Sequence, residues 1–193
     1  MAKPALRNFT NEREYAFVSE GARNLALIVG GSLLVGLCAR VSIPLPFTPV
    51  PLTMQNFGVL LVGLLLGSRR GFAAMLLYLA QGAVGLPVFS PTGAGGIAQL
   101  FHGPTGGFLL AYPLVAVSAG YIWEHNRKTF LRATLAGFLG EIVLFTAGLA
   151  WLAVLTHSLA QAVRWGLYWF VFAEVIKIMM AAGIAVQWRK RSC

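Results

Sequence analysis

The sequence predicts an all-α integral membrane protein in which six helices cross the bilayer and both termini are cytoplasmic. The composition is the first reason. Of 193 residues, 58% are hydrophobic and only 11% are charged, less than half of the roughly 25% charged residues in soluble domains. The apolar residues form long runs without the period-two alternation of transmembrane barrel strands. The basic residues, finally, fall in short clusters between these runs.

Six runs approach the ~20 residues that a helix needs to cross the hydrocarbon core. The expected spans are about 24–42, 53–68, 71–87, 106–123, 132–156 and 165–187. They form one membrane domain over 1–193, with the six-helix bundle at about 23–188 and a polar cytoplasmic lead-in at about 1–22. The first run lacks a small-residue cleavage signature, so a cleaved signal peptide is not expected.

The net charge of +9 would suit a nucleic-acid-binding protein only if the basic residues formed one surface stripe. They lie instead between the spans, which is typical of membrane topology and of contact with anionic lipid, not nucleic acid. Twelve of the fifteen fall on one side of a six-span chain: Lys3, Arg7, Arg13, Arg23, Arg69, Arg70, Arg127, Lys128, Arg132, Arg189, Lys190 and Arg191. The positive-inside rule makes that side cytoplasmic, and a multi-pass plasma (inner) membrane location follows.

Two outer loops, 42–53 and 87–107, stand out. The first carries Pro44, Pro46, Pro49 and Pro51; each proline fixes its own φ and biases the residue before it, so this loop is expected to be stiff and non-helical. The second is rich in glycine and uncharged. It is suited to cover a site and open again, although an ordinary connector has the same composition.

The last span places two charges in an apolar run. Glu174 and Lys177 are three residues apart and share one helix face with Gly166, Phe170 and Ala181. Exposure of such a face to lipid costs about 2.5–3.5 kcal/mol per charge on insertion scales. The face is therefore expected to line the bundle interior or a water-accessible cavity, with Lys177 and Glu174 as binding residues.

An alternative reading is an ion pair that only holds helices together. Glu141 in the fifth span reaches a depth similar to that of Lys177, so the two are candidates to neutralise each other. Even a paired lysine keeps donors for a ligand carbonyl or carboxylate, so the structural and binding roles are compatible.

Small residues recur along the first span at Ala22, Ala26 and Gly30. Such a small-xxx-small track permits close helix approach. It indicates either packing inside the bundle or docking onto a separate membrane partner.

Other chemistries find little support. No GxxxxGK[ST], GxSxG or HExxH pattern occurs, and the three histidines fall on different loops. We therefore expect no metal, no cofactor and no enzymatic activity. Two rival classes stay open at this stage: an integral-membrane enzyme acting on lipid or a prenyl chain, and a helical scaffold.

The stretch IPLPFTPVPLTMQNFGVLLVGLLLGSRRGFAAMLLYLAQGAVGLPVF (43–89), followed by GPTGGFLLAYPL (103–114), resembles the BioY family. The likeness extends from the first span to about Ala182. It implies a six-helix substrate-binding S component of an energy-coupling factor (ECF) transporter. Such a component captures biotin at high affinity for vitamin uptake and works with a transmembrane coupling protein and two cytoplasmic ATPases. An S component for a related small vitamin is the alternative within the class.

The resemblance also implies a site. In the family, a Pro-Gly-Asp segment and a following Lys on the last helix contact biotin, and the matching residues here are Phe172, Ala173, Glu174 and Lys177. Glu174 replaces the family aspartate, and the Pro-Gly is absent. Glu174 is expected to accept from the ureido N–H and Lys177 to donate to the ureido oxygen or to support Glu174. The other candidate binding residues are Phe89, Ser90, Gly95 and Gly96 as a lid, and more weakly Gln55, Tyr78, Gln81 and Tyr112.

Overall fold

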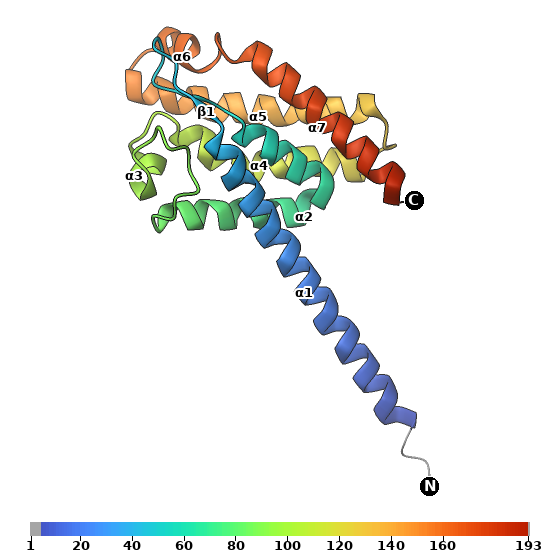
Figure 1. The fold of residues 1–193 in the computed structure, drawn as a ribbon. Helices are drawn as coiled ribbons and strands as arrows, with labels where there is room; N and C mark the ends of the chain where they lie inside the picture. Colours follow the sequence, from blue (N-terminus) through green and yellow to red (C-terminus); the bar gives the residue numbers. More distant parts are fainter. Residues whose placement is uncertain (1–4, 193) are drawn as a thin grey trace.

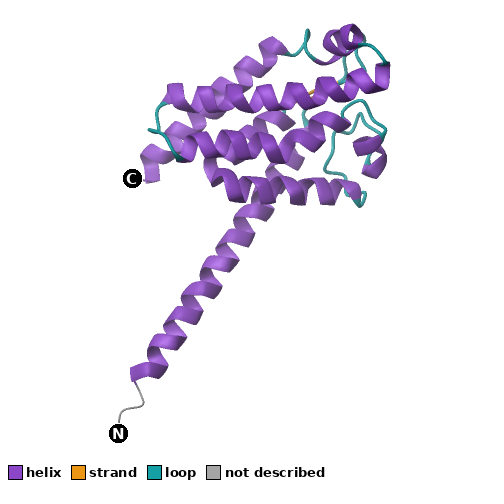
Figure 2. Cartoon of the chain, turned by 180° about the vertical axis from the view of Figure 1, so that it is seen from behind, coloured by secondary structure: helices purple, strands orange, loops and turns teal. Residues whose placement is uncertain are grey.

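The computed structural model describes the backbone of residues 5–192 and the side chains of 20–191. Over that range the regular elements are all helices apart from one short hairpin, so the predicted all-α membrane architecture is confirmed (Figures 1 and 2). The elements are α1 (Ala5–Arg40), β1 (Ser42–Ile43), β2 (Leu52–Thr53), α2 (Gln55–Ala83), α3 (Gly96–Phe101), α4 (Gly106–Glu124), α5 (Phe130–Thr156), α6 (Leu159–Gly166) and α7 (Val171–Ser192). Five helices within the described residues, α1, α2, α4, α5 and α7, are long and apolar enough to cross a bilayer.

The helix α2 is broken at Gly67, where φ is 82° and ψ is 177°. This conformation is open to glycine and strained for any residue with a Cβ. The helical arms 55–66 and 68–83 fold back on each other, since a Cβ built on Gly71 would lie 3.3 Å from the Gly63 Cα. The two short runs expected at 53–68 and 71–87 are thus the two arms of α2.

The helix α1 starts at Ala5, so most of the expected lead-in at 1–22 is helical; residues 1–4 lie outside the described range. With 36 residues and a rise of ~1.5 Å per residue, α1 is ~54 Å long. Its C-terminal half packs on α2, whereas its N-terminal half extends away from the bundle (Figures 1 and 2).

The connections 42–53, α3 and α6 gather at one end of the bundle, which we call the loop end (Figure 1). The loop 42–53 is not entirely irregular: β1 and β2 pair antiparallel at its base, with Ser42 opposite Thr53. All four prolines lie between these two strands, because proline cannot supply a ladder N–H.

The apolar run expected to be one helix over 165–187 is divided, which corrects the sequence-based interpretation. The helix α6 ends at Gly166 and α7 begins at Val171. Between them, the Phe170 N–H donates to the Leu167 carbonyl, a tight-turn bond, and Thr48 Oγ1 donates to the Trp165 carbonyl at 2.8 Å. Satisfying this freed carbonyl from the loop 42–53 stabilises the break.

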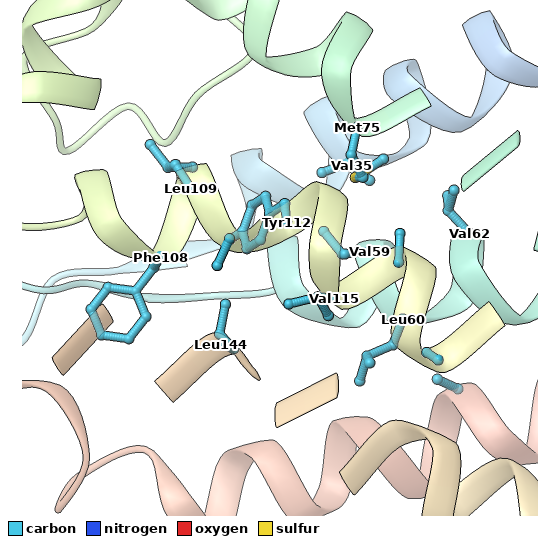
Figure 3. Close-up of a cluster of buried hydrophobic side chains, with 14 of the residues drawn as sticks. Val35, Val59, Leu60, Val62, Met75, Phe108, Leu109, Tyr112, Val115 and Leu144 are labelled. Atoms are coloured by element: carbon cyan, nitrogen blue, oxygen red, sulfur yellow. The ribbon is translucent and has the colours of Figure 1, made fainter. Parts of the chain in front are cut away.

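The helices α2, α4 and α5 form the centre of the bundle. Close approach of α2 and α4 depends on Gly63, where an added Cβ would lie 2.8 Å from the Ala116 carbonyl oxygen. Val59, Leu60 and Val115 are completely buried nearby. Toward the loop end the filling becomes aromatic, with Phe108 and Tyr112 of α4 lying by Leu144 of α5 (Figure 3).

Candidate functional site

A cavity lies at the loop end, between the loop 42–53 and the first turns of α2, α4 and α7. Its volume is about 50 Å³, enough for a few water molecules. Its walls come from six segments of the chain: Val50, Pro51, Thr53, Gln55, Asn56, Thr105, Phe108, Leu109, Tyr112, Leu144, Phe145, Gly166, Phe170, Glu174 and Lys177. A mostly apolar wall with a few convergent polar groups is typical of a small-molecule site.

The charged face of the last helix lines this cavity. Gly166, Phe170, Glu174 and Lys177 all border it, and Ala181 is fully buried one turn deeper. Lys177 Nζ lies 2.7 Å from Glu174 Oε1, as an ion pair one helical turn apart. Glu174 also stands in the first turn of α7, where the helix dipole favours a negative charge.

Glu141 does not pair with Lys177 in this structure, contrary to the alternative reading of the sequence. Lys177 donates to Glu174, and Glu141 Oε1 instead accepts a hydrogen bond from Asn56 Nδ2. The same amide nitrogen donates to Glu174 Oε2 at 2.8 Å. Asn56 on α2 therefore joins a carboxylate of α5 to a carboxylate of α7.

The cluster of Asn56, Glu141, Glu174 and Lys177 is buried, each residue being only 4–6% exposed. Not all of its polar atoms are satisfied: Asn56 Oδ1 and Glu141 Oε2 have no hydrogen-bond partner among the described residues. Lys177 has three donors and uses one on Glu174. The cluster thus has an unused acceptor on Asn56, and unused donors on Lys177, at the edge of the cavity.

The structure divides the other predicted binding residues into two groups. Tyr112 and Gln55 border the cavity. Tyr78 lies behind them: its hydroxyl accepts from Gln55 Nε2 and donates to the Val88 carbonyl. Gln81 is half-buried and does not line the cavity, and its Oε1 has no partner among the described residues.

The lid candidates also lie outside the cavity wall. Phe89 is buried edge-on against the Tyr78 ring, with centroids 5.4 Å apart. Ser90 Oγ lies 2.8 Å from Ser42 Oγ, which ties the glycine-rich loop to the base of the loop 42–53. Gly95 and Gly96 have positive φ at the start of α3, with open space beside them.

The small-residue track on α1 is uncovered. Ala22, Ala26 and Gly30 are all exposed, and nothing lies within 4 Å of a Cβ built on Gly30. Packing inside the bundle, one of the two readings of this track, is therefore not what the structure has.

Asn56 and Phe108 are the cavity residues that sequence reasoning missed most clearly. Asn56 follows Gln55 in a run that was read as an ordinary span, and a single amide near a helix start carries no periodic signal. Its depth next to Glu141 depends on how α2, α5 and α7 are registered. Among the described residues, no group of three or more His, Cys, Asp or Glu side chains is placed to hold a metal ion.

The fold and the site define a multi-pass helical membrane protein with a charged cavity at one end of its bundle. A model of the BioY family matches residues 8–192. The chain belongs to the BioY family, a family of membrane transporters.

Curated relatives named as biotin transporters match most of this chain. The chain is 35% identical to the biotin transporter BioY2 of Lactococcus lactis, over 81% of this chain and 85% of the relative. It is 34% identical to the biotin transporter BioY of Thermotoga maritima, over 85% and 95% of the two chains. A crystal structure of the S-component for biotin from an ECF-type ABC transporter matches with a TM-score of 0.80 at 24% identity, covering 89% of this chain and 93% of that one. That likeness supports the fold.

Proposed function

We propose that this protein is the biotin-binding S component of an ECF-type vitamin uptake transporter. The observation that carries the proposal is the buried Glu174–Lys177 pair, whose two side chains both border a cavity at the loop end. Intramembrane ionisable residues mark substrate sites by default. Relatives of similar length named as biotin transporters supply the identity of the ligand.

Biotin suits such a site chemically. Its ureido group has two N–H donors and one carbonyl acceptor, and its bicycle and valeryl chain are apolar. In the proposed complex Glu174 accepts from a ureido N–H, Lys177 donates to the ureido oxygen, and the rings of Phe108, Tyr112 and Phe170 cover the bicycle. The remaining lone pairs of Glu174 and the remaining protons of Lys177 leave room for these bonds.

The cavity must widen to admit the ligand. Its volume of about 50 Å³ is far below the ~300–1,000 Å³ of ligand pockets. Displacement of the loop 42–53 would widen the cavity, since this loop forms one of its walls. The bond from Thr48 to the Trp165 carbonyl at the end of α6 would have to break as the loop moves. The glycine-rich loop with Phe89, Ser90, Gly95 and Gly96 would then act as the cover, from behind the cavity wall.

We further propose six membrane crossings with both termini in the cytoplasm. The two arms of α2 count as separate crossings because Gly67 reverses the chain. The turn at 67, the loop 125–129 and the C-terminus lie at the end of the bundle opposite the loop end (Figure 1). These segments and the helix ends next to them carry the basic residues Arg69, Arg70, Arg127, Lys128, Arg132, Arg189, Lys190 and Arg191, which supports a cytoplasmic side there.

The exposed track Ala22, Ala26 and Gly30 is the proposed docking face for the transmembrane coupling protein. The absence of side-chain bulk along one face permits close helix contact in a bilayer. Two cytoplasmic ATPases would complete the transporter, as the likeness to an ECF-type S component suggests. The sequence itself contains no phosphate-binding loop.

Equilibrium binding of radiolabelled biotin to the purified protein tests the proposal. Saturable binding in the nanomolar to micromolar range is expected. Saturable binding of another radiolabelled vitamin, without binding of biotin, would support the alternative within the class. Turnover of a lipid or prenyl substrate, without any vitamin binding, would instead support the membrane-enzyme alternative.

A further inference from the structure

We propose that Asn56 is a ligand-binding residue of this site, that its Oδ1 accepts a hydrogen bond from one ureido N–H, and that Glu141 is the residue that orients it. The inference rests on the proposed biotin-binding function and extends it to two side chains on α2 and α5.

The orientation of the Asn56 amide follows from its neighbours. Its Nδ2 lies within hydrogen-bonding distance of Glu141 Oε1 and of Glu174 Oε2. Carboxylate oxygens are acceptors, so the amide must present its NH₂ group to both of them. A flipped amide would place Oδ1 against two oxygens. The two carboxylates together therefore fix Asn56 Oδ1 on the opposite edge of the amide.

The fixed Oδ1 is a buried acceptor without a partner. Asn56 is 4% exposed, it borders the cavity, and its Oδ1 makes no hydrogen bond with any described residue. A buried acceptor without a partner has lost its hydrogen bond to water and gained none in return, so it is less stable than a satisfied one. A ligand N–H that reaches Oδ1 recovers this energy, and an apolar ligand cannot.

The resulting site is complementary to a cyclic urea. Asn56 Oδ1 and Glu174 accept from its two N–H groups, and Lys177 donates to the carbonyl between them. Glu141 touches no ligand in this arrangement, because it does not border the cavity and reaches it only through its bond with Asn56. It is a positioning residue: without it, one of the two acceptors that fix the amide is lost.

Two isosteric carbamate analogues of biotin test the assignment, each with one ureido N–H replaced by oxygen. Binding of biotin and of both analogues is measured on the purified wild-type protein and on Asn56→Leu, which keeps the side-chain volume but removes the acceptor. In the wild type, we expect each analogue to bind about 10- to 100-fold more weakly than biotin. In Asn56→Leu, one analogue is expected to bind as well as biotin to within about threefold, whereas the other keeps its loss.

Glu141→Leu is a second route to the same result and is used if Asn56→Leu does not accumulate. It is expected to shrink the loss for the same analogue, because the Asn56 amide is then free to turn. Asn24→Leu is the matched control: Asn24 Oδ1 is also buried without a partner among the described residues, but Asn24 lies on α1 outside the cavity. This control is expected to keep the wild-type losses for both analogues.

Equal losses for both analogues in the wild type and in Asn56→Leu would overturn the assignment while leaving biotin binding intact. Biotin binding by Asn56→Leu at wild-type strength would do the same. Absence of biotin binding by the wild type would instead remove the proposed function, and this inference with it.

Discussion

Replacing Lys177 by methionine separates the binding role of the charges from their role in stability. Lys177 is 5% exposed and pairs with Glu174 at 2.7 Å. Removal of one partner of a buried pair costs about 3–5 kcal/mol of unfolding free energy. We expect about 3 kcal/mol, since Glu174 keeps its hydrogen bond from Asn56. The lost charged hydrogen bond to the ligand, about 1.5–3 kcal/mol, should raise the Kd about 10- to 150-fold.

The double variant, with both Glu174→Met and Lys177→Met, distinguishes a binding role of the pair from a purely structural one. Replacement of both members of a buried pair by apolar residues is often neutral or stabilising. Thermal unfolding in detergent should therefore show the stability restored, while the binding of radiolabelled biotin stays at least as weak as in Lys177→Met. Lys190→Met, at an exposed position near the end of α7, is the control and should change neither measurement. If the double variant binds biotin like the wild type, the Glu174–Lys177 pair has only a structural role and does not bind the ligand.

Three further outcomes follow from the structure. Gly67→Ala should destabilise the protein by about 1–3 kcal/mol or more, because the φ of Gly67 is 82° and the added Cβ would lie 1.9 Å from Glu124 Oε1. The control Gly21→Ala, at a glycine with open space around it, should leave the thermal unfolding curve unchanged. Equal unfolding curves for the two variants would contradict the break at Gly67. Thr48→Val removes the hydrogen bond to the Trp165 carbonyl, which contributes about 0.5–1.5 kcal/mol, and should speed biotin dissociation about 2- to 10-fold in a filter-binding chase. An unchanged dissociation rate would show that this bond does not hold the loop 42–53 closed. Burial, together with the neighbouring Arg189, lowers the pKa of Lys128 in the folded protein below its usual 10.5. Between that lowered pKa and pH 10.5 the unfolded chain binds more protons than the folded one, so the melting temperature should rise as the pH increases toward 10.5. The rise should disappear in Lys128→Gln, and its persistence in that variant would assign it to another group.

The parts of the site that lie within one helix were predictable from sequence. Glu174 and Lys177 share a face with Gly166 and Phe170 because residues three and four apart face the same way, and an apolar run makes the cost of exposing charge evident. The length of the apolar runs, together with Arg69 and Arg70 between them, indicated a boundary between two spans there, and the structure has the reversal at Gly67.

The contacts between helices were not predictable in this way. Glu141 lies 85 residues beyond Asn56 along the chain, and Glu174 lies 118 residues beyond it. Their meeting depends on the relative depth of α2, α5 and α7, which a single sequence does not encode in any local pattern. The division between α6 and α7 was missed for a related reason: the bond that stabilises it comes from Thr48, more than a hundred residues away.

The most direct measurement is an experimental structure of the purified protein with biotin bound. We expect the ureido ring to lie beside Lys177, Glu174 and Asn56, with the cavity enlarged and the bicycle against Tyr112. Biotin found elsewhere, for example in the groove that Phe138, Ile142 and Val175 line between α5 and α7, with the buried charges unchanged, would contradict it.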